Sequence, residues 1–255
     1  MSGHSKWSTI KRQKGVVDAR RGAAFTKVAN AITLAAREGG TDPESNFKLR
    51  LAIEAAKSVN MPKDNIERAI ARGGGTSKEG SVLEQITYEG FGPAGVGIVV
   101  EAVTDNRQRT AQEVRSTFER NGGRLSGPGS VSHFFRPIGE IVVRGGGGLD
   151  PDQLLLVAAD SGAEDVETDE QEAIVYCQTA NLEKVKSRLS TQGLDIVESK
   201  ISRQPTTTIK VDDEKIASSV LSLVNKLDDL ADVQKVYANF DISNEILMRN
   251  ASIVK

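Results

Sequence analysis

The hydrophobic period of this chain changes near residue 82, and that change limits the folds available to it. Before this point, apolar residues recur every three or four positions, which predicts amphipathic helices over 18–38, 43–59 and 62–73. The second of these is expected to begin with Asp42 as its N-cap and Pro43 in its first turn. Beyond residue 82, strand-like runs such as EQITYEG and AGVGIVVEAVTD alternate with helical segments. The pattern predicts the α+β class, with a small helical domain at the N-terminus.

Residues 137–205 contain a complete βαββαβ order, which is the pattern of ferredoxin-like domains. The block before them, 79–136, lacks one helix and one strand, and the segment 206–255 supplies one of each. We therefore predict one ferredoxin-like α+β domain made of 79–136 plus 206–255, with a second ferredoxin-like domain, 137–205, inserted in it. An alternative keeps the C-terminal piece as a cap on the inserted domain. The remaining boundaries are a basic flexible arm at 1–15 and the helical domain at 16–78.

Composition predicts a soluble globular protein of the cytoplasm. The 255 residues exceed the usual size of one domain, and 38% hydrophobic with 27% charged residues argues against disorder. No apolar run reaches the length of a membrane span, and the N-terminus lacks an apolar signal core. The single cysteine, Cys177, can form no internal disulfide, and two distant histidines give no zinc-site spacing. We expect no metal, no cofactor, no membrane partner and no small-molecule substrate.

Charge is distributed unevenly along a chain whose formal net charge is −2. Residues 1–37 carry eight lysines and arginines against one acid, while the charges of residues 38–80 balance. A basic end on an otherwise acidic body is the electrostatic pattern of a protein that contacts a polyanion with that end. A solvated basic tail explains the same pattern, and charge alone does not separate the two interpretations.

The basic end contains the only tryptophan of the chain, Trp7, in the leader MSGHSKWSTIKRQKG. In one interpretation the indole stacks on an unpaired base while the neighbouring cations neutralise phosphates. Those cations are Lys6, Lys11, Arg12 and Lys14. In the other interpretation Trp7 folds back and attaches the arm to the helical domain.

A second basic motif, TDNRQRT at 104–110, begins a predicted helix. Asp105 or Asn106 is expected to cap this helix, which leaves two arginines, Arg107 and Arg109, in its first turn. Cations are unfavourable at this end of the helix dipole, so their presence calls for an explanation. They suit a phosphate bound at the exposed amides, or a salt bridge to one of the many acids, and both interpretations stay open.

The sequence has no arrangement typical of catalysis. His133 lies in GSVSHFF, which is expected to be a strand, and no nucleophile motif accompanies it or His4. Cys177 alternates within a strand and is expected to be a small buried hydrophobe. The acidic run 160–172 is explained by a solvated loop and an edge strand, and docking to a basic partner is the alternative. We therefore expect a protein that is not an enzyme.

Five motifs along the chain resemble the YebC family, whose mitochondrial member is the translational activator of cytochrome c oxidase subunit one. They are GHSKW at 3–7, NMPKDNIERAI at 60–70, YEGFGPAGV at 88–96, TDNRQRT at 104–110 and GSVS at 129–132. The resemblance implies a helical N-terminal domain followed by two α+β domains around a shallow groove. It also implies a DNA-binding transcriptional regulator, or else a ribosome-associated translation factor that eases elongation at proline-rich stretches.

The predicted function is therefore a nucleic-acid-binding regulator of gene expression, with DNA or ribosomal RNA, and with it the ribosome, as the partner. A protein-interaction scaffold with an acidic groove is a further alternative. The candidate nucleic-acid-binding residues combine the leader, the first predicted helix and the TDNRQRT motif. They are His4, Ser5, Lys6, Trp7, Lys11, Arg12, Lys14, Arg20, Arg21, Lys27, Arg107 and Arg109.

Overall fold

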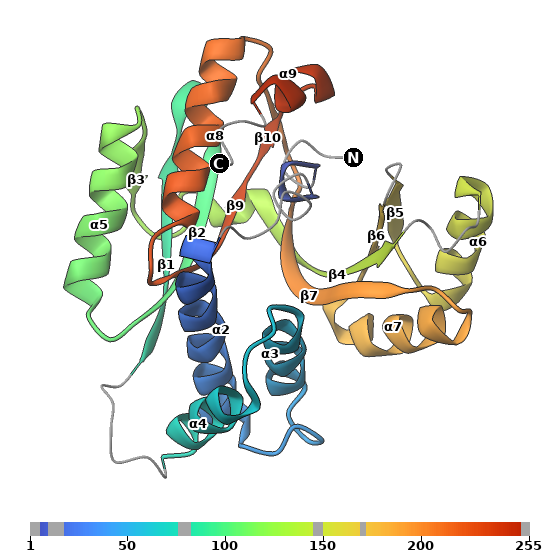
Figure 1. Cartoon of the computed structure of the whole chain (residues 1–255). Coiled ribbons are helices and arrows are strands. Elements are labelled where there is room, and N and C mark those ends of the chain that lie inside the picture. The colour runs from blue at the N-terminus through green and yellow to red at the C-terminus, as the bar shows by residue number, and fades with distance from the viewer. Residues whose placement is uncertain (1–5, 10–17, 76–82, 145–149, 169–171, 251–255) are drawn as a thin grey trace. The chain divides into compact units, whose positions relative to one another are not determined.

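The computed structural model describes residues 6–9, 18–75, 83–144, 150–168 and 172–250, and for residues 18–21 and 23 only the backbone. Helices come first along the chain, and two sheet-containing regions follow (Figure 1). The predicted α+β class is thus confirmed. By its internal contacts the chain divides into a smaller unit, residues 135–206, and a larger unit formed by the chain on both sides of it.

Three helices form the N-terminal part of the larger unit. They are α2 (Asp18–Gly39), α3 (Phe47–Ser58) and α4 (Lys63–Gly73). The start predicted for the second helix is wrong, because Asn46 rather than Asp42 is the N-cap of α3. Asn46 Oδ1 accepts a hydrogen bond from the amide of Leu49 at 3.1 Å. The Asp42 carboxylate instead accepts from the amide of Glu44 at 3.0 Å, in the turn before the helix.

Small residues let α2 and α4 pack closely. A Cβ atom added to Gly73 would lie 2.4 Å from the backbone oxygen of Thr33, so only glycine fits there. The Thr33 hydroxyl donates to the carbonyl oxygen of Ala69 at 3.1 Å, which satisfies a buried polar group at the same crossing. The buried core of this part is Ile32, Ala35, Ala36, Leu49, Ala56, Met61, Ile66 and Ala69.

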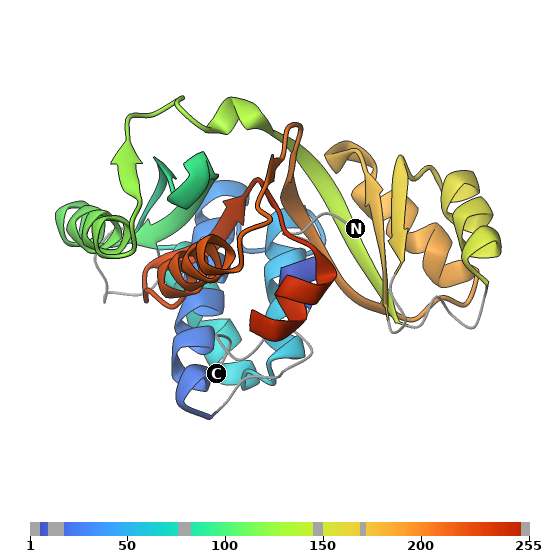
Figure 2. The ribbon, with the colours of Figure 1, turned by 90° about the horizontal axis from the view of Figure 1, so that it is seen from above.

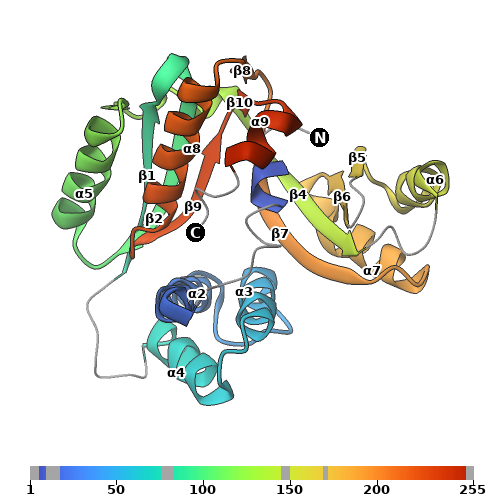
Figure 3. The same cartoon turned by 45° about the horizontal axis from the view of Figure 1, so that its top comes forward.

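The larger unit also contains a four-stranded antiparallel sheet in the order β3-β1-β2-β9. Figure 3 labels three of its strands, β1, β2 and β9. Its strands are β1 (Glu84–Phe91), β2 (Gly97–Thr104), β3 (Arg124–Ser126) and β9 (Val233–Ala238). One face packs against α5 (Arg107–Arg120) and α8 (Glu214–Asp228), which also contact each other. Because β9 lies beyond residues 135–206 and pairs with β2, the chain before and after that region contributes to one sheet.

The strands β1 and β2 form a hairpin in the middle of this sheet, with Glu84 opposite Thr104. Two strands therefore precede α5, and the chain order differs from the βαββαβ order of the smaller unit. The turn η1 (Pro93–Gly95) joins the strands, and Ala94 has a positive φ of 58° in it. Near the C-terminus lie the parallel pair β8 (Ile209–Lys210) and β10 (Phe240–Asp241), and the helix α9 (Asn244–Arg249).

Residues 135–206 form the second α+β unit, in the βαββαβ order. Its elements are β4 (Phe135–Arg144), α6 (Pro151–Ser161), β5 (Asp165–Thr168), β6 (Glu172–Cys177), α7 (Leu182–Thr191) and β7 (Ile196–Pro205). The strands are antiparallel in the order β5-β6-β4-β7. The helices α6 and α7 contact each other, and both contact the sheet (Figure 2).

The segment GSVSHFF does not form the predicted strand. Residues Ser132–Phe134 make a short 3-10 turn, η2, and β4 begins only after it. The amides of Val131 and Ser132 donate to the carboxylate of Glu89, at 2.6 and 2.8 Å, instead of pairing with a neighbouring strand. His133 consequently lies exposed in a turn rather than in the middle of a strand.

Candidate nucleic-acid interface

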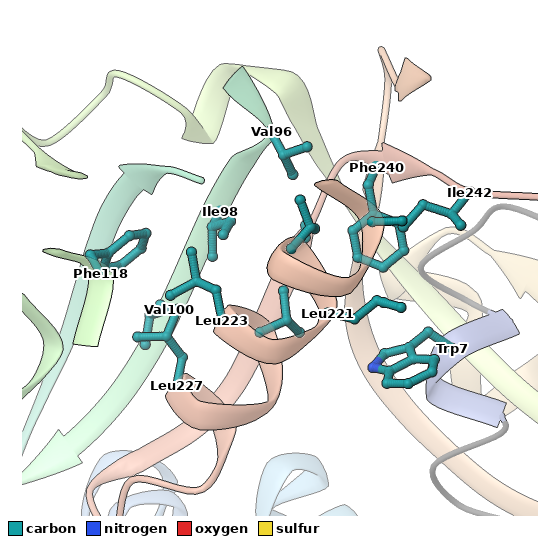
Figure 4. Close-up of a cluster of buried hydrophobic side chains, with 14 of the residues drawn as sticks. Trp7, Val96, Ile98, Val100, Phe118, Leu221, Leu223, Leu227, Phe240 and Ile242 are labelled. Carbon is teal, nitrogen blue, oxygen red and sulfur yellow. The ribbon is translucent and has the colours of Figure 1, made fainter. Parts of the chain in front are cut away.

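Trp7 is buried in the core of the larger unit. Residues 6–9 form a helical turn that places the indole, 2% exposed, among side chains of α8 and the C-terminal segment (Figure 4). Leu221, Phe240 and Ile242 belong to the same core. The predicted stacking of Trp7 on a nucleobase is therefore wrong, because neither face of the ring is free for a base. The alternative prediction is corrected as well, since the core that takes up Trp7 belongs to the α+β part of the unit.

The indole nitrogen has a hydrogen-bond partner inside this core. Trp7 Nε1 donates to Oδ1 of Asn225 at 3.3 Å, and the Asn225 side chain comes from α8. Thr9, two residues further along the turn, is buried too. A turn that contributes two buried side chains and a buried hydrogen bond is a structural part of the fold.

Most of the predicted leader contacts lie outside the described residues. These are His4, Ser5, Lys11, Arg12 and Lys14. The backbones of Arg20 and Arg21 belong to the first turn of α2, and their side chains are outside the description. Lys6 is described and is partly exposed. For all of these residues, contact with nucleic acid stays a prediction.

Two of the predicted cations, Lys27 and Arg109, are held by acids near the start of β9. Lys27 Nζ donates to the carbonyl oxygen of Asp228 and lies 3.7 Å from Oδ1 of the same residue. Arg109 Nη2 lies 2.7 Å from Oδ2 of Asp232 and 3.1 Å from Oδ1 of Asp105. For Arg109 the structure thus shows the salt bridge that the sequence left open as an alternative to phosphate.

The carboxylate of Asp232 is the centre of a network that fixes the TDNRQRT motif. Its Oδ2 accepts from the hydroxyls of Thr104 at 2.9 Å and Thr110 at 2.6 Å, in addition to Arg109. Burial alone would raise the pKa of Asp232, but these hydrogen bonds and the charge of Arg109 hold the pKa below its ordinary value. Asn106 caps α5 by accepting from the Arg109 amide at 3.1 Å. Most of the motif therefore has a structural explanation.

Arg107 is the exposed arginine that this network does not involve. It lies at the first residue of α5, and its backbone oxygen accepts from the hydroxyl of Tyr88 at 3.5 Å. Burial raises the pKa of Tyr88, and the positive charge of Arg107 opposes that shift. Of the two arginines that were predicted to bind phosphate, Arg107 is the better placed to do so.

A buried carboxylate, that of Glu89, connects the motifs YEGFGPAGV and GSVS. It is 6% exposed and accepts from three amides, those of Gly129 at 2.8 Å, Val131 at 2.6 Å and Ser132 at 2.8 Å. Burial alone would raise the pKa of Glu89, but the three amides and the Ser132 hydroxyl hold the pKa below its ordinary value. The sequence analysis missed both Glu89 and Asp232, because their partners lie 40 to 128 positions away.

The described residues offer cations, ordered loops and backbone amides rather than a cluster of metal ligands. Among them, no group of three or more His, Cys, Asp and Glu side chains could hold a metal ion. Within the same ranges, no helix is both long enough and apolar enough to span a membrane. Cys177 is buried in β6 as predicted, although this strand is buried on both faces and does not alternate.

Among the described residues, three helices followed by two α+β regions define a class of α+β proteins with a helical N-terminal part. Residues 5–76 match the N-terminal domain of TACO1/YebC proteins, and residues 83–240 match their second and third domains. The chain belongs to the TACO1/YebC family, and the predicted resemblance is confirmed.

Relatives of this chain cover nearly its whole length. A "probable transcriptional regulatory protein" of Chloroflexus aurantiacus is 51% identical over 98% of this chain and 99% of its own length. A protein of the same name from a Synechococcus strain is 48% identical, covering 97% of this chain and 98% of its own. The crystal structure of a conserved hypothetical protein from Aquifex aeolicus has a TM-score of 0.84 and 44% identity, over 91% of this chain and 95% of that one.

Proposed function

We propose that this chain is a non-enzymatic nucleic-acid-binding regulator of gene expression, and that it acts on DNA as a transcriptional regulator. The observation that carries this proposal is the basic stretch 6–21, which contains six lysines and arginines against one acid. A stretch of this charge attracts a polyanion and releases its counterions. The names of the relatives from Chloroflexus aurantiacus and Synechococcus support a role in transcription.

Fixed points of the larger unit flank this basic stretch. Near its start, Trp7 is buried in the core that contains α8. Near its end, α2 begins at Asp18, and the Lys27 side chain of this helix is bound to Asp228. The cations between these points are therefore attached to the folded unit on both sides.

Phosphates rather than bases are the expected target of these cations. The indole of Trp7 is occupied by the core, so no stacking aromatic accompanies them. The helix α4 also carries cations, but Lys63 pairs with Glu67 at 3.5 Å and Arg68 donates to Asn65. Contacts to phosphates position a protein on nucleic acid without reading its sequence.

The burial of Trp7 also bears on the choice between DNA and RNA. A stacking aromatic on a flexible arm favours single-stranded RNA, and the structure removes that argument. A ribosome-associated translation factor is the second candidate, because phosphate contacts without base reading suit ribosomal RNA as well as DNA. A protein scaffold with an acidic groove is the outcome if the chain binds no nucleic acid.

The first experiment neutralises the leader without removing Trp7 from the core. Deletion of the leader would confound binding with folding, so Lys11, Arg12 and Lys14 are changed to Gln together. The affinities for duplex DNA and for ribosomal RNA are then measured across salt concentrations. If three phosphates are lost, the slope of log K against log salt on duplex DNA becomes shallower by about 2.7. The matched control changes three exposed lysines on other helices, Lys57, Lys184 and Lys215, to Gln.

Equal salt slopes for the leader variant and the control variant would overturn the proposal, as would a flat response of the unaltered protein. The second experiment separates DNA from the ribosome. The protein is crosslinked in cells, and the attached nucleic acid is sequenced with the leader variant as the background. Enrichment of genomic DNA supports the transcriptional regulator, and enrichment of ribosomal RNA supports the translation factor.

A further inference from the structure

The helix α6 is apolar on two sides. Leu154 and Ala158 are buried, so one side of the helix packs within its unit. Leu155 and Leu156 are 51% and 67% exposed, and Ala159 is exposed as well. The spacing of these three residues places them on one stripe of the helix. An amphipathic surface helix normally carries polar residues there, and a helix that is apolar all round is normally buried.

Exposure of this kind is uncommon in the described part of the chain. Only four large hydrophobic side chains of the described residues are classed as exposed: Leu155, Leu156, Ile216 and Met248. Two of the four are neighbours on α6, while the others lie singly on α8 and α9. Single exposed apolar residues are ordinary, but contiguous apolar surface marks an interaction site.

Two acids border this apolar stripe. Asp152 and Asp160 lie four residues before and four residues after Leu156, on the same row of the helix, and both are exposed. Neither carboxylate forms an ion pair with any other residue that the structure describes. The helix itself contains no lysine or arginine. The negative potential along α6 is therefore not neutralised by cations on the same helix.

A groove runs beside the stripe, between α6 and α7. It is lined by Val157, Asp160, Ser161, Arg188, Thr191 and Gln192. The guanidinium of Arg188 lies over the end of α6, where it is 3.4 Å from the carbonyl oxygens of both Asp160 and Ser161. A cation at this position stabilises the C-terminus of the helix dipole. The groove thus gives the exposed leucines a polar border on the α7 side.

We propose that this surface, the α6 stripe (Asp152, Leu155, Leu156, Ala159 and Asp160), docks a basic amphipathic helix of a protein partner. The apolar face of such a helix covers the two leucines, as in other helix-in-groove complexes. Its flanking lysines or arginines pair with Asp152 and Asp160. The ion pairs between these partner cations and the two aspartates, one at each end of the stripe, then fix the orientation of the partner.

The charges on the stripe argue against the other occupants. Nucleic acid and anionic lipid headgroups carry negative charge, which the two aspartates repel. A second copy of the chain bound through a two-fold axis would bring the same stripe against itself. Asp152 and Asp160 would then face the same two carboxylates of the other copy, and α6 itself supplies no cation to pair with them. A positively charged protein segment avoids each of these repulsions.

The test places the photoreactive residue p-benzoylphenylalanine at position 156 in the full chain, expressed in the cells that contain it naturally. The control carries the same residue at position 248, because Met248 is 60% exposed on another helix. Crosslinked partners are digested, and the attached peptide is identified by mass spectrometry. The proposal expects a partner peptide that is basic and amphipathic at helical spacing, at position 156 and not at 248.

A charge swap then tests the pairing with the peptide so identified. The double variant D152K/D160K is expected to bind that synthetic peptide at least tenfold more weakly. A peptide whose facing lysines or arginines are changed to Glu is expected to regain affinity for the variant. Leu156→Ser should weaken binding in both combinations, that is, the original stripe with the original peptide and the charge-swapped stripe with the charge-swapped peptide. The exposed control change Asp212→Lys should weaken neither.

Several outcomes would overturn the proposal. They are a crosslink at 156 no stronger than at 248, an attached peptide without basic residues, and attachment to nucleic acid, to lipid or to this chain itself. The proposal would also be overturned if the D152K/D160K variant bound the peptide with the affinity of the unaltered protein. Thiol protection of the buried Cys177, which lies in the same unit, shows that each variant is folded.

Discussion

Trp7 Nε1 and Asn225 Oδ1, which lie 218 positions apart in the chain, are joined by a hydrogen bond of 3.3 Å. The bond is the polar part of a contact whose apolar part is the burial of the indole (Figure 4). Within the described residues, Nδ2 of the same asparagine has no hydrogen-bond partner, so the bond to Trp7 satisfies only the oxygen of this side chain. The N-terminal turn therefore belongs to the same cooperative structure as α8.

Trp7→Ala is expected to lower the free energy of unfolding of the larger unit by about 3–5 kcal/mol, because it leaves a cavity among buried side chains. The measurement is chemical denaturation followed by far-UV circular dichroism. Met248→Ala is the control, since it shortens a side chain that is 60% exposed and should change stability little. A Trp7→Ala protein that keeps its stability but loses affinity for nucleic acid would restore the indole as a stacking platform.

Much of the fold could be predicted from local patterns. The period of 3.6 in 18–73 and the period of 2 beyond residue 82 depend only on neighbouring residues, so helices and strands were recognised. The run AGVGIVVEAVTD predicted a strand, and β2 lies within it. The burial of Cys177 was predicted as well, although β6 is buried on both faces instead of alternating.

The remainder depends on contacts between distant residues. The strand predicted for GSVSHFF is absent because Glu89, 40 or more positions earlier, takes its amides. The stacking predicted for Trp7 failed because a residue 218 positions away forms its site. Asn46 and Asp42 are both good N-caps, and the sequence alone could not decide which one accepts from the amide at the third residue of the helix.

Asp232→Asn is expected to lower the free energy of unfolding at pH 7 by roughly 1–3 kcal/mol, because three donors lose a charged acceptor. The pKa of Asp232 in the folded protein lies below its value in the unfolded chain, which is about 3.9. Its carboxylate thus stabilises the fold above that pH, and the contribution is lost as pH falls through the folded pKa. When the pH is lowered from 7 to below about 4, the free energy of unfolding should therefore fall less for the variant than for the unaltered protein.

Denaturation at pH 7 and at several values below pH 4 measures this effect. Asp212→Asn is the control, because the exposed Asp212 carboxylate pairs only with Lys210, at 3.1 Å, in the described contacts. Surface pairs of this kind contribute little to stability. Identical acid profiles of Asp232→Asn and the unaltered protein would contradict a stabilising role for the network.

Arg107→Gln and Arg109→Gln are expected to have opposite effects. Arg107 is exposed outside the Asp232 network, so its loss should leave stability unchanged and make the salt slope on duplex DNA shallower by about 0.9. Arg109 is held by Asp232 and Asp105, so its loss should reduce stability and leave the slope unchanged. Binding isotherms at several salt concentrations and parallel denaturation curves separate the two. A shallower slope for Arg109→Gln alone would show that Arg109 is the phosphate contact.

The thiol of Cys177 is expected to be unreactive in the folded protein. Burial, together with the charge of Glu164, raises the pKa of Cys177 to about 11, so the thiolate fraction at pH 8 is about one in a thousand. Ellman's reagent at pH 8 should react only when the unit 135–206 opens. Gly139→Ala should speed the reaction, because a Cβ at Gly139 would lie 2.8 Å from Sγ of Cys177. Reaction of the unaltered protein at the rate of an unfolded thiol would show that the unit 135–206 does not protect Cys177 from solvent.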